Sequence, residues 1–282
     1  MAIAPLGIIT AVSYNQYKAA FREGLIQPAQ RLTSSMKRSI EFFLEERRAA
    51  MKFIVRDRSF AELADQQQMT LIFRNMREAF GGIIDLGLIG SAGVQRSYAG
   101  PYELRGVNYA HENWFREVRL RDVYVSDVFL GYRAFPHFVI AVRHEDRDGG
   151  FYVLRATLDL KILERQIAAL DLGPSSDAFL INHNGVLQTS SGSGFHVLES
   201  YLRVPDYTEG AKVSEERDEG GNPYILGYAY IESSPFIFVM LKKPDALRQG
   251  WGAMRNELLG FLATSIVLIL LLVVGTSSYM VA

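Results

Sequence analysis

The chain of 282 residues contains no cysteine, and this absence removes several kinds of chemistry. It has no disulfide bonds, no thiolate ligands for a metal and no thiol nucleophile. An extracytoplasmic location is compatible with this composition but not required by it. Nor does one sign of charge prevail, since 30 basic side chains stand against 31 acidic ones. There is thus no electrostatic case for a nucleic-acid partner.

Motifs for catalysis or phosphate binding are also missing. The sequence has no P-loop, no GxSxG, no HExxH and no zinc-type spacing of histidine and cysteine. Its five histidines are scattered over predicted loops and strand ends. The glycines of SGSG, Ser191 to Gly194, lack the strand and helix of a nucleotide-binding loop. We therefore expect no catalytic residue, no metal site and no cofactor in this chain.

Long apolar segments do occur, and they stand at the two ends. Leu258 to Ala282 carries no charged side chain, and roughly 20 apolar residues suffice to cross a bilayer as a helix. We interpret it as a transmembrane helix, with a buried globular helix as the alternative. Ala2 to Val12 is apolar but about half the required length, as in a truncated span. No basic residue precedes it, which disfavours a cleaved signal peptide.

The region between these ends begins with a helical pattern. Apolar residues recur every three or four positions from Ala29 to Ile54, interleaved with charged ones. We predict a stalk helix from near Tyr14 to Val55, kinked at Pro28. Its apolar stripe indicates packing on the rest of the domain or, alternatively, on a two-fold partner helix. A second helical pattern, Phe60 to Phe80, ends at two glycines.

From Ile83 onward the apolar period becomes two, which predicts strands. One set of strands, with a short helix or loop near Trp114, ends in a helix over Leu160 to Leu170. A second set follows, with a hairpin turn at His183 to Gly185. The fold class is thus α+β, with a stalk helix and two tandem antiparallel-sheet modules flanked by transmembrane helices.

These patterns divide the chain into five parts. They are a truncated first transmembrane helix (1–13), stalk and connecting helices (14–80), a first sheet module (81–173), a second sheet module (174–243), and a juxtamembrane and second transmembrane helix (244–282).

Arg155 is a charged residue in the middle of the predicted strand FYVLRATLDL. Alternation places it on one face with Val153 and Thr157, while Leu154 and Leu158 share the other face. A guanidinium in mid-strand needs a partner. Its planar fork suits a carboxylate or phosphate, so either a ligand acid or a protein carboxylate can fill that role, with exposure to solvent as the third alternative.

A second group of candidate residues lies on neighbouring predicted strands. Tyr124 and Ser126 are two apart in VYVSDVF and therefore point to one face, with Asp127 and Phe129 on the opposite face. Tyr98, on VQRSYAG, is a candidate for the same cavity. Aromatic rings with a few directed polar groups are typical of a small-molecule pocket, but they can equally be core aromatics.

The chain resembles a known family in three ordered segments: NYAHENWFREVRLRDVYVSDVFLGYRAFPHFVIAVRH, GFYVLRATLDL and DAFLINHNGVLQTS. They resemble the double Cache sensor domain of bacterial membrane receptors, a tandem of PAS-like modules behind a long N-terminal helix. The likeness covers about Tyr14 to Leu247 and is closest to sensor histidine kinases. It implies an inner-membrane protein whose modules are periplasmic or extracellular, with a ligand in the membrane-distal first module.

The resemblance also implies site residues. Trp114 and Phe115 match the aromatic pair that covers the ligand in the family, and the ligand would lie against the strand of Tyr124. Amino-acid-sensing members carry an arginine and an aspartate where this chain has Glu112 and Thr157. This difference disfavours an amino acid and, with Arg155, suggests a small carboxylate. The expected ligand-binding residues are Trp114, Phe115, Tyr124, Ser126, Arg155, Thr157 and Tyr98.

The sequence thus predicts the extracytoplasmic small-ligand sensor region of a homodimeric transmembrane receptor, most simply the input part of a two-component histidine kinase. Kinase activity would belong to a continuation past Ala282. The input of a chemotaxis receptor or of a diguanylate cyclase is the alternative. A membrane-anchored enzyme or a ligand-free scaffold is an alternative of another class.

Overall fold

The structure is a computed structural model that describes residues 3–133, 135–146, 149–170, 172, 176–192, 194–200, 204–218, 220–242, 260, 263–267, 271 and 274–275. No helix within these ranges combines the length and the apolar character that crossing a bilayer requires. Residues 243–259 and most of 260–282 lie outside the described ranges. The juxtamembrane helix and the second transmembrane helix therefore stay predictions.

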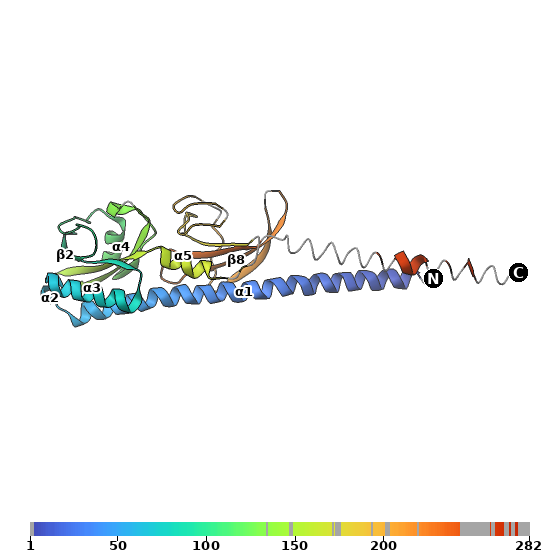
Figure 1. Ribbon diagram of the computed structural model, residues 1–282, viewed down its shortest axis with the longest axis horizontal. Helices are drawn as coiled ribbons and strands as arrows, with labels where there is room; N and C mark the ends of the chain where they lie inside the picture. The colour runs from blue at the N-terminus through green and yellow to red at the C-terminus, as the bar shows by residue number, and fades with distance from the viewer. Residues whose placement is uncertain are drawn as a thin grey trace.

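The first helix, α1, spans Ile3–Asp57 and is 55 residues long, or about 80 Å. Figure 1 shows it running beneath both sheets and continuing past the second one. The predicted end at Val55 is correct within two residues, but the predicted start near Tyr14 is wrong. Pro5 stands in the first turn, where its missing N–H has no helical acceptor in any case. Pro28 lies inside the helix, which continues through it.

Two helices, not one, follow α1. The predicted pattern over 60–80 is divided at Asp65 into α2 (Phe60–Ala64) and α3 (Gln66–Phe80). The side chain of Asp65 accepts a hydrogen bond from the backbone N–H of Gln68, 2.9 Å away, and so caps α3. Gly81, with a φ of 61°, ends α3 as predicted.

The first sheet has five antiparallel strands in the order β2-β1-β5-β4-β3. Its strands are β1 (Ile83–Gly90), β2 (Gln95–Ala99), β3 (Val123–Val125), β4 (His137–Glu145) and β5 (Phe151–Asp159), and α4 (Asn113–Arg121) lies between β2 and β3 in sequence. After β3 the chain is irregular and then forms a short 3-10 helix, Gly131–Arg133. The strand predicted from VYVSDVF is therefore shorter than expected.

Helix α5 (Lys161–Ala168) leads to the second sheet, which is also antiparallel, in the order β6-β9-β8-β7. Its strands are β6 (Ser176–Ile181), β7 (Lys212–Arg217), β8 (Pro223–Tyr230) and β9 (Ile237–Lys242). The predicted turn after β6 is present, because the backbone N–H of Gly185 donates to the carbonyl of Asn182 at 3.0 Å. The segment after the turn forms isolated bridges in place of a strand, one between Ile181 and Leu187 and one between Val186 and Ser200.

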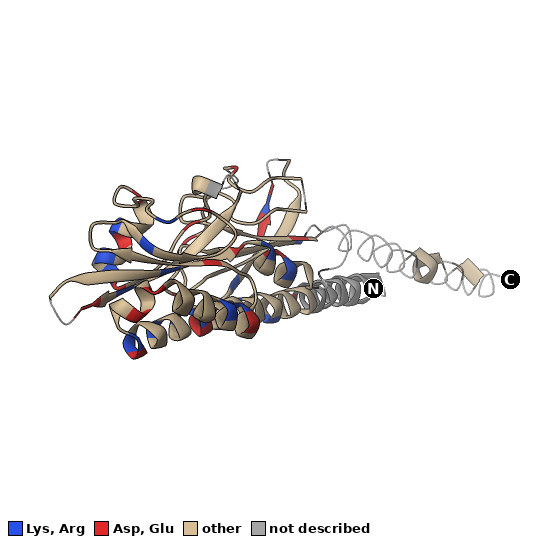
Figure 2. Ribbon diagram, turned by 60° about the vertical axis from the view of Figure 1, so that its left-hand side comes forward, with Lys and Arg blue, Asp and Glu red and all other residues tan. Residues whose placement is uncertain are grey.

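One apolar core joins the helices to both sheets. It contains Ile40 and Phe43 of α1, Leu154 of β5 and Phe238 of β9, all buried. Packing of the α1 stripe on the rest of the domain is thereby confirmed. The opposite face of each sheet carries a smaller apolar cluster of its own. Charged residues of both signs are spread over helices and loops, in keeping with the balanced composition (Figure 2).

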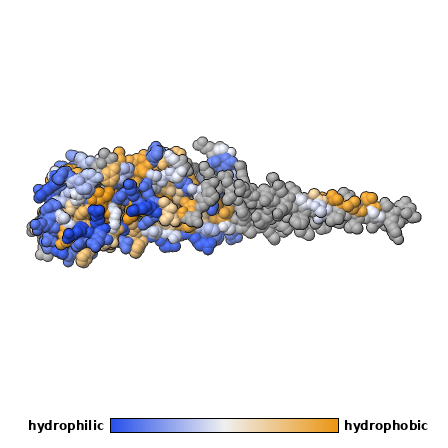
Figure 3. Space-filling view, in the orientation of Figure 1, coloured by the Kyte–Doolittle hydropathy of each residue, from blue (hydrophilic) through white to orange (hydrophobic). Residues whose placement is uncertain are grey.

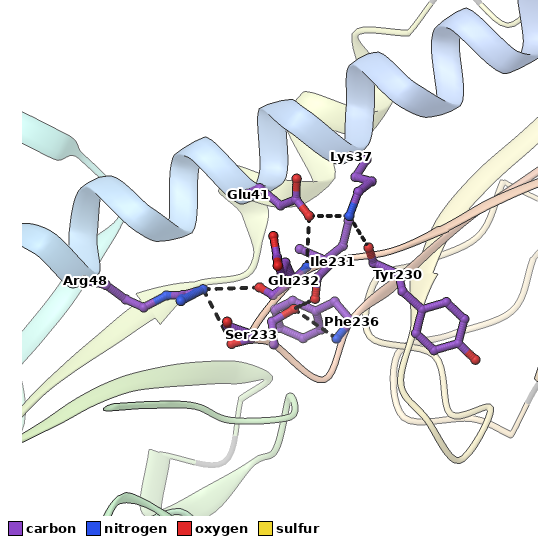
Figure 4. Close-up of polar contacts among 9 residues, drawn as sticks. Lys37, Glu41, Arg48, Tyr230, Ile231, Glu232, Ser233 and Phe236 are labelled. Atoms are coloured by element: carbon purple, nitrogen blue, oxygen red, sulfur yellow. Dashed lines mark hydrogen bonds and ion pairs between the residues drawn. The ribbon is translucent and has the colours of Figure 1, made fainter. Parts of the chain in front are cut away.

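Polar contacts fix α1 to the turn between β8 and β9 (Figure 4). The Lys37 ammonium donates to the carbonyl of Tyr230 at 2.8 Å and to Glu41 at 2.5 Å. The same Glu41 oxygen accepts the backbone N–H of Glu232 at 3.0 Å. Arg48 donates to the carbonyl of Glu232 at 3.3 Å. A movement of the second sheet against α1 would have to break these bonds.

Candidate functional site

A row of residues crosses all five strands on the face of the first sheet that turns away from α1. Its members, in order from β2 to β3, are Tyr98, Gly87, Arg155, Ala141 and Tyr124. Large and small residues alternate along the row, so that Gly87 and Ala141 separate the arginine from the two tyrosines. Three residues predicted to bind ligand thus share one line across the sheet.

The next row holds Thr157 and, at its β3 end, Ser126. Thr157 pairs with Asp85 of β1 on one side and with Val139 of β4 on the other. The Ser126 hydroxyl accepts the backbone N–H of Val139 at 2.9 Å and donates to the carbonyl of Asp127 at 2.7 Å. Both hydrogen bonds are internal to the protein, so Ser126 holds the end of the row in place.

The partner of Arg155 in the structure is Asp85. One guanidinium nitrogen of Arg155 lies 3.1 Å from a carboxylate oxygen of Asp85, and the Thr157 hydroxyl donates to that same oxygen at 2.7 Å. The two charged side chains are 1% and 0% exposed. Burial by itself lowers the pKa of Arg155, but Asp85 and then Tyr109 raise it, and the net pKa is raised. The arginine is therefore charged and paired with a protein carboxylate.

Two aromatic rings lie over this ion pair. The guanidinium carbon of Arg155 is 4.8 Å from the ring centroid of Tyr109 and 5.7 Å from that of Trp114. Tyr109 and Trp114 are tilted against each other with centroids 5.3 Å apart, and Phe115 meets Trp114 edge to face at 5.7 Å. A cation under two aromatic rings is stabilised by their quadrupoles. The predicted pair Trp114 and Phe115 is thus buried against the first sheet.

Tyr124 lies at the far edge of the row and is half-buried. Burial raises the pKa of the Tyr124 hydroxyl, Asp127 and Glu117 raise it further, and Arg121 partly opposes them. Phe129 packs against the same apolar cluster as Tyr124. The expectation that Phe129 occupies the opposite face is wrong, because the strand ends at Val125 and alternation does not continue past it.

Sequence reasoning missed three residues of this cluster: Asp85, Gln95 and Tyr109. Asp85 could have been found, since it is the sole polar side chain in the strand IIDLGLIG. Gln95 is 1% exposed, and its side chain bends toward Gly87. A Cβ atom at position 87 would lie 3.0 Å from the Gln95 amide oxygen and 3.5 Å from a guanidinium nitrogen of Arg155. Glycine at position 87 therefore leaves room for both polar groups.

Several buried polar atoms around Gly87 have no hydrogen-bond partner among the described residues. They include both amide atoms of Gln95 and the Nε of Arg155. A buried polar atom left without a partner costs about 1 to 3 kcal/mol of stability. A ligand that accepts from two donors and donates to one acceptor would remove this cost. In the part of the chain that the structure describes, no cluster of acidic or histidine side chains could hold a metal ion.

Comparisons with known proteins find the same fold among solved structures. No family model matches the chain, and no curated protein matches it either. Solved structures do match. The extracellular domain of the histidine kinase candidate rpHK1S-Z16 has a TM-score of 0.64 and 16% identity, and the match covers 83% of this chain and 99% of that one. This chain has the fold of extracellular sensor domains.

Two chemoreceptor domains match as well. The ligand-binding domain of Pseudomonas fluorescens CtaA, in complex with L-isoleucine, has a TM-score of 0.63 and 14% identity over 82% of this chain and 97% of that one. The domain of Pseudomonas aeruginosa PctC, in complex with GABA, has a TM-score of 0.58 and 13% identity over 78% and 100%. At the level of the fold, the resemblance to double Cache sensor domains is confirmed.

Proposed function

We propose that this chain is the extracytoplasmic sensor region of a transmembrane signalling receptor, and that it binds a small molecule in its first sheet module. The observation that carries the proposal is the match over 99% of the extracellular domain of the histidine kinase candidate rpHK1S-Z16, combined with a buried polar cluster on the first sheet. Because identity is only 16%, the fold supports the class of protein and the cluster supports the place of binding.

The proposed ligand site lies between the first sheet and α4. It comprises the predicted residues Trp114, Phe115, Tyr124, Ser126, Arg155, Thr157 and Tyr98, together with Asp85, Gln95 and Tyr109. The ligand we propose is a small carboxylate. The free Nε–H of Arg155 and the amide N–H of Gln95 are two donors for its oxygens, and the Gln95 carbonyl oxygen can accept from a hydroxyl or N–H of the same molecule.

The charge of the site restricts the class of ligand further. Asp85 already neutralises Arg155 at 3.1 Å, so a second buried negative charge is stabilised by hydrogen bonds more than by net attraction. A monocarboxylate with an adjacent donor suits this site better than a dianion. The ligands L-isoleucine and GABA belong to CtaA and PctC. The family resemblance implies an arginine and an aspartate in amino-acid-sensing members at the positions of Glu112 and Thr157, so we propose a ligand other than an ordinary amino acid.

Membrane anchoring is part of the proposal. In the C-terminal apolar segment, the described residues Val267, Leu271 and Val274 are 54%, 64% and 61% exposed. Figure 3 shows hydrophobic surface on the described residues of the extended part of the molecule. Exposed aliphatic side chains in a helix are stable in lipid. We place the protein in the bacterial inner membrane with both sheets on the outer side, and we retain the five parts with boundaries at 13, 80, 173 and 243.

A homodimer is proposed from α1. Phe42 and Phe53 of this helix are 67% and 66% exposed, and their separation of about three helical turns places them on one side. Large exposed aromatics on a stalk helix suit a two-fold partner helix. For the output we propose a two-component histidine kinase. Chemotaxis receptors remain the second candidate, because the CtaA domain has a TM-score of 0.63.

A thermal-shift screen of the full chain against small metabolites tests the proposal. A ligand present at 100 times its dissociation constant stabilises the folded state by about 2.7 kcal/mol. We expect a monocarboxylate to raise the unfolding temperature. If no metabolite raises it, the ligand-free scaffold is the better reading. If a compound is consumed during incubation, the membrane-anchored enzyme is the better reading.

A further inference from the structure

A cavity of about 950 Å³ lies at an edge of the first sheet. Its walls are α3, the start of β1, the end of β2 with the loop that follows, and the region around α5. Arg155, Thr157 and Trp114 are not among the described residues that line it. Tyr98 is the one residue of the proposed ligand site that also lines this cleft, so the two sites adjoin at Tyr98 but differ in their charged residues. Binding in the cleft does not depend on the proposed function.

Three arginines from three separate elements line the cleft: Arg77 of α3, Arg105 of the loop after β2, and Arg165 of α5. All three are exposed, and none forms an ion pair with a described residue. Two carboxylates, Glu103 and Asp159, also line it. Asp159 already accepts the backbone N–H of Lys161 at 2.9 Å. The lining thus carries one more positive than negative charge.

The walls of the cleft are held in place by hydrogen bonds. The Gln66 amide donates to the carbonyl of Tyr98 at 2.6 Å and ties α3 to β2. The Tyr98 hydroxyl accepts the backbone N–H of Tyr102 at 3.2 Å and ties the loop to the sheet. Gly100 lets this loop pass against Asp85 and Tyr98, since a Cβ atom there would lie 2.5 Å from the Tyr98 hydroxyl.

The helix dipole explains the positions of two of the three arginines but not that of the third. Arg77 and Arg165 stand in the last turns of α3 and α5, where a cation is favoured by the helix dipole. Arg105 lies on a loop and has no such reason for its position. Convergence of all three on one cleft needs a further explanation, and guanidinium groups are the side chains that best match carboxylate and phosphate oxygens.

We propose that this cleft binds a small oxyanion, a carboxylate or phosphate group, between Arg77, Arg105 and Arg165. A bound anion would connect α3 and the loop after β2 with α5, the helix that leads from the first sheet to the second. Because α5 belongs to this connection, the anion would change the stability of the junction between the modules. The cleft is thus a second ligand input, which adjoins the site under α4 at Tyr98 but holds its anion with other residues.

The test measures binding of two probes, inorganic phosphate and succinate, to the full chain by isothermal titration calorimetry. Sodium chloride at equal ionic strength controls for screening of exposed charges. We expect at least one probe to bind, and we expect the double variant Arg77→Ala, Arg165→Ala to bind it at least tenfold more weakly. Arg74→Ala is the matched control, since it removes an exposed arginine of α3 that does not line the cleft.

Each result of the titrations either supports or overturns the proposal. Phosphate binding alone assigns a phosphate group, and succinate binding alone assigns a carboxylate, provided that the double variant loses it. Binding that survives in the double variant belongs elsewhere, including the cluster around Arg155, and overturns the proposal. The absence of binding heat with both probes also overturns the proposal. An equal loss of binding in Arg74→Ala overturns it as well. All three positions are exposed, so unfolding of the variants is not expected to obscure the result.

Discussion

Phe138 of β4 and Phe236, just before β9, meet edge to face with ring centroids 5.5 Å apart. Both side chains are fully buried, although one belongs to the first sheet and the other to the turn of the second. The same turn contacts α1 through Glu41 and Arg48 (Figure 4). This aromatic contact therefore joins the two sheets at the point where α1 contacts the second one.

Removing the Phe236 ring should weaken the packing between the two sheets. We expect Phe236→Ala to destabilise the protein by about 3 to 5 kcal/mol, because a buried ring is lost and a cavity remains. Urea denaturation followed by fluorescence measures the change. Phe195→Ala, at a side chain that is 42% exposed, should cost far less. Equal effects of the two substitutions would contradict the role of the aromatic contact.

Asp85 is expected to be essential for stability because it neutralises a buried charge. Asp85→Asn leaves Arg155 charged and without a carboxylate, which should cost about 3 to 5 kcal/mol. The double variant Asp85→Leu, Arg155→Met should recover much of this loss, since it removes both charges. Asp122→Asn is the control, because Asp122 is a 72% exposed partner of Arg143 and should contribute under about 1 kcal/mol. Chemical denaturation compares the four proteins.

Gln95 offers a test in which stability and binding change in opposite directions. Gln95→Leu removes two buried polar atoms that have no described partner, so we expect the ligand-free protein to gain about 1 kcal/mol or more. The same substitution should weaken ligand binding at least tenfold. Thermal unfolding and calorimetry give the two values. If Gln95→Leu destabilises the protein and leaves binding intact, Gln95 is a structural residue.

Glu41 is expected to hold the β8–β9 turn on α1. Glu41→Ala removes the acceptor of both Lys37 and the backbone N–H of Glu232, and it should cost about 1 to 2 kcal/mol. Faster hydrogen exchange of the Glu232 amide should accompany the loss. Glu45→Ala is the matched control on the same helix, since Glu45 is 59% exposed in its pair with Arg48. An unchanged exchange rate in Glu41→Ala would argue against this contact.

Tyr152 should make stability fall at high pH. Its hydroxyl donates to the carbonyl oxygens of Val55 and Arg58, at 3.2 and 3.3 Å. Burial, with a contribution from Asp146, raises the pKa of Tyr152 to about 12 from 10. The unfolded chain loses this proton first, so stabilisation is complete below pH 10 and is lost as the pH rises toward 12. Tyr152→Phe should show a shallower decline of unfolding free energy over this range.

Local periodicity predicted much of the architecture. The period-two segment IIDLGLIG became β1 with the expected bounds, and the face shared by Val153, Arg155 and Thr157 was correct. Gly81 ended α3 as its position suggested. These features depend on the steric properties of adjacent residues, which act wherever the segment lies in the fold. The short β3 was not foreseen, because hydrogen bonds from outside the segment decide where pairing stops.

By itself, the sequence determined which residues share a face along each strand and where helices such as α3 end. It also showed that Arg155, in the middle of a strand, needs a partner. Only the tertiary structure decided that this partner is Asp85, 70 positions earlier in the chain. Strand order placed Tyr98, Arg155 and Tyr124 in one row and brought Gln95 beside Gly87. The physical reason is that alternation is a property of one strand, whereas the neighbours of a side chain across a sheet depend on which strands pair and in which register.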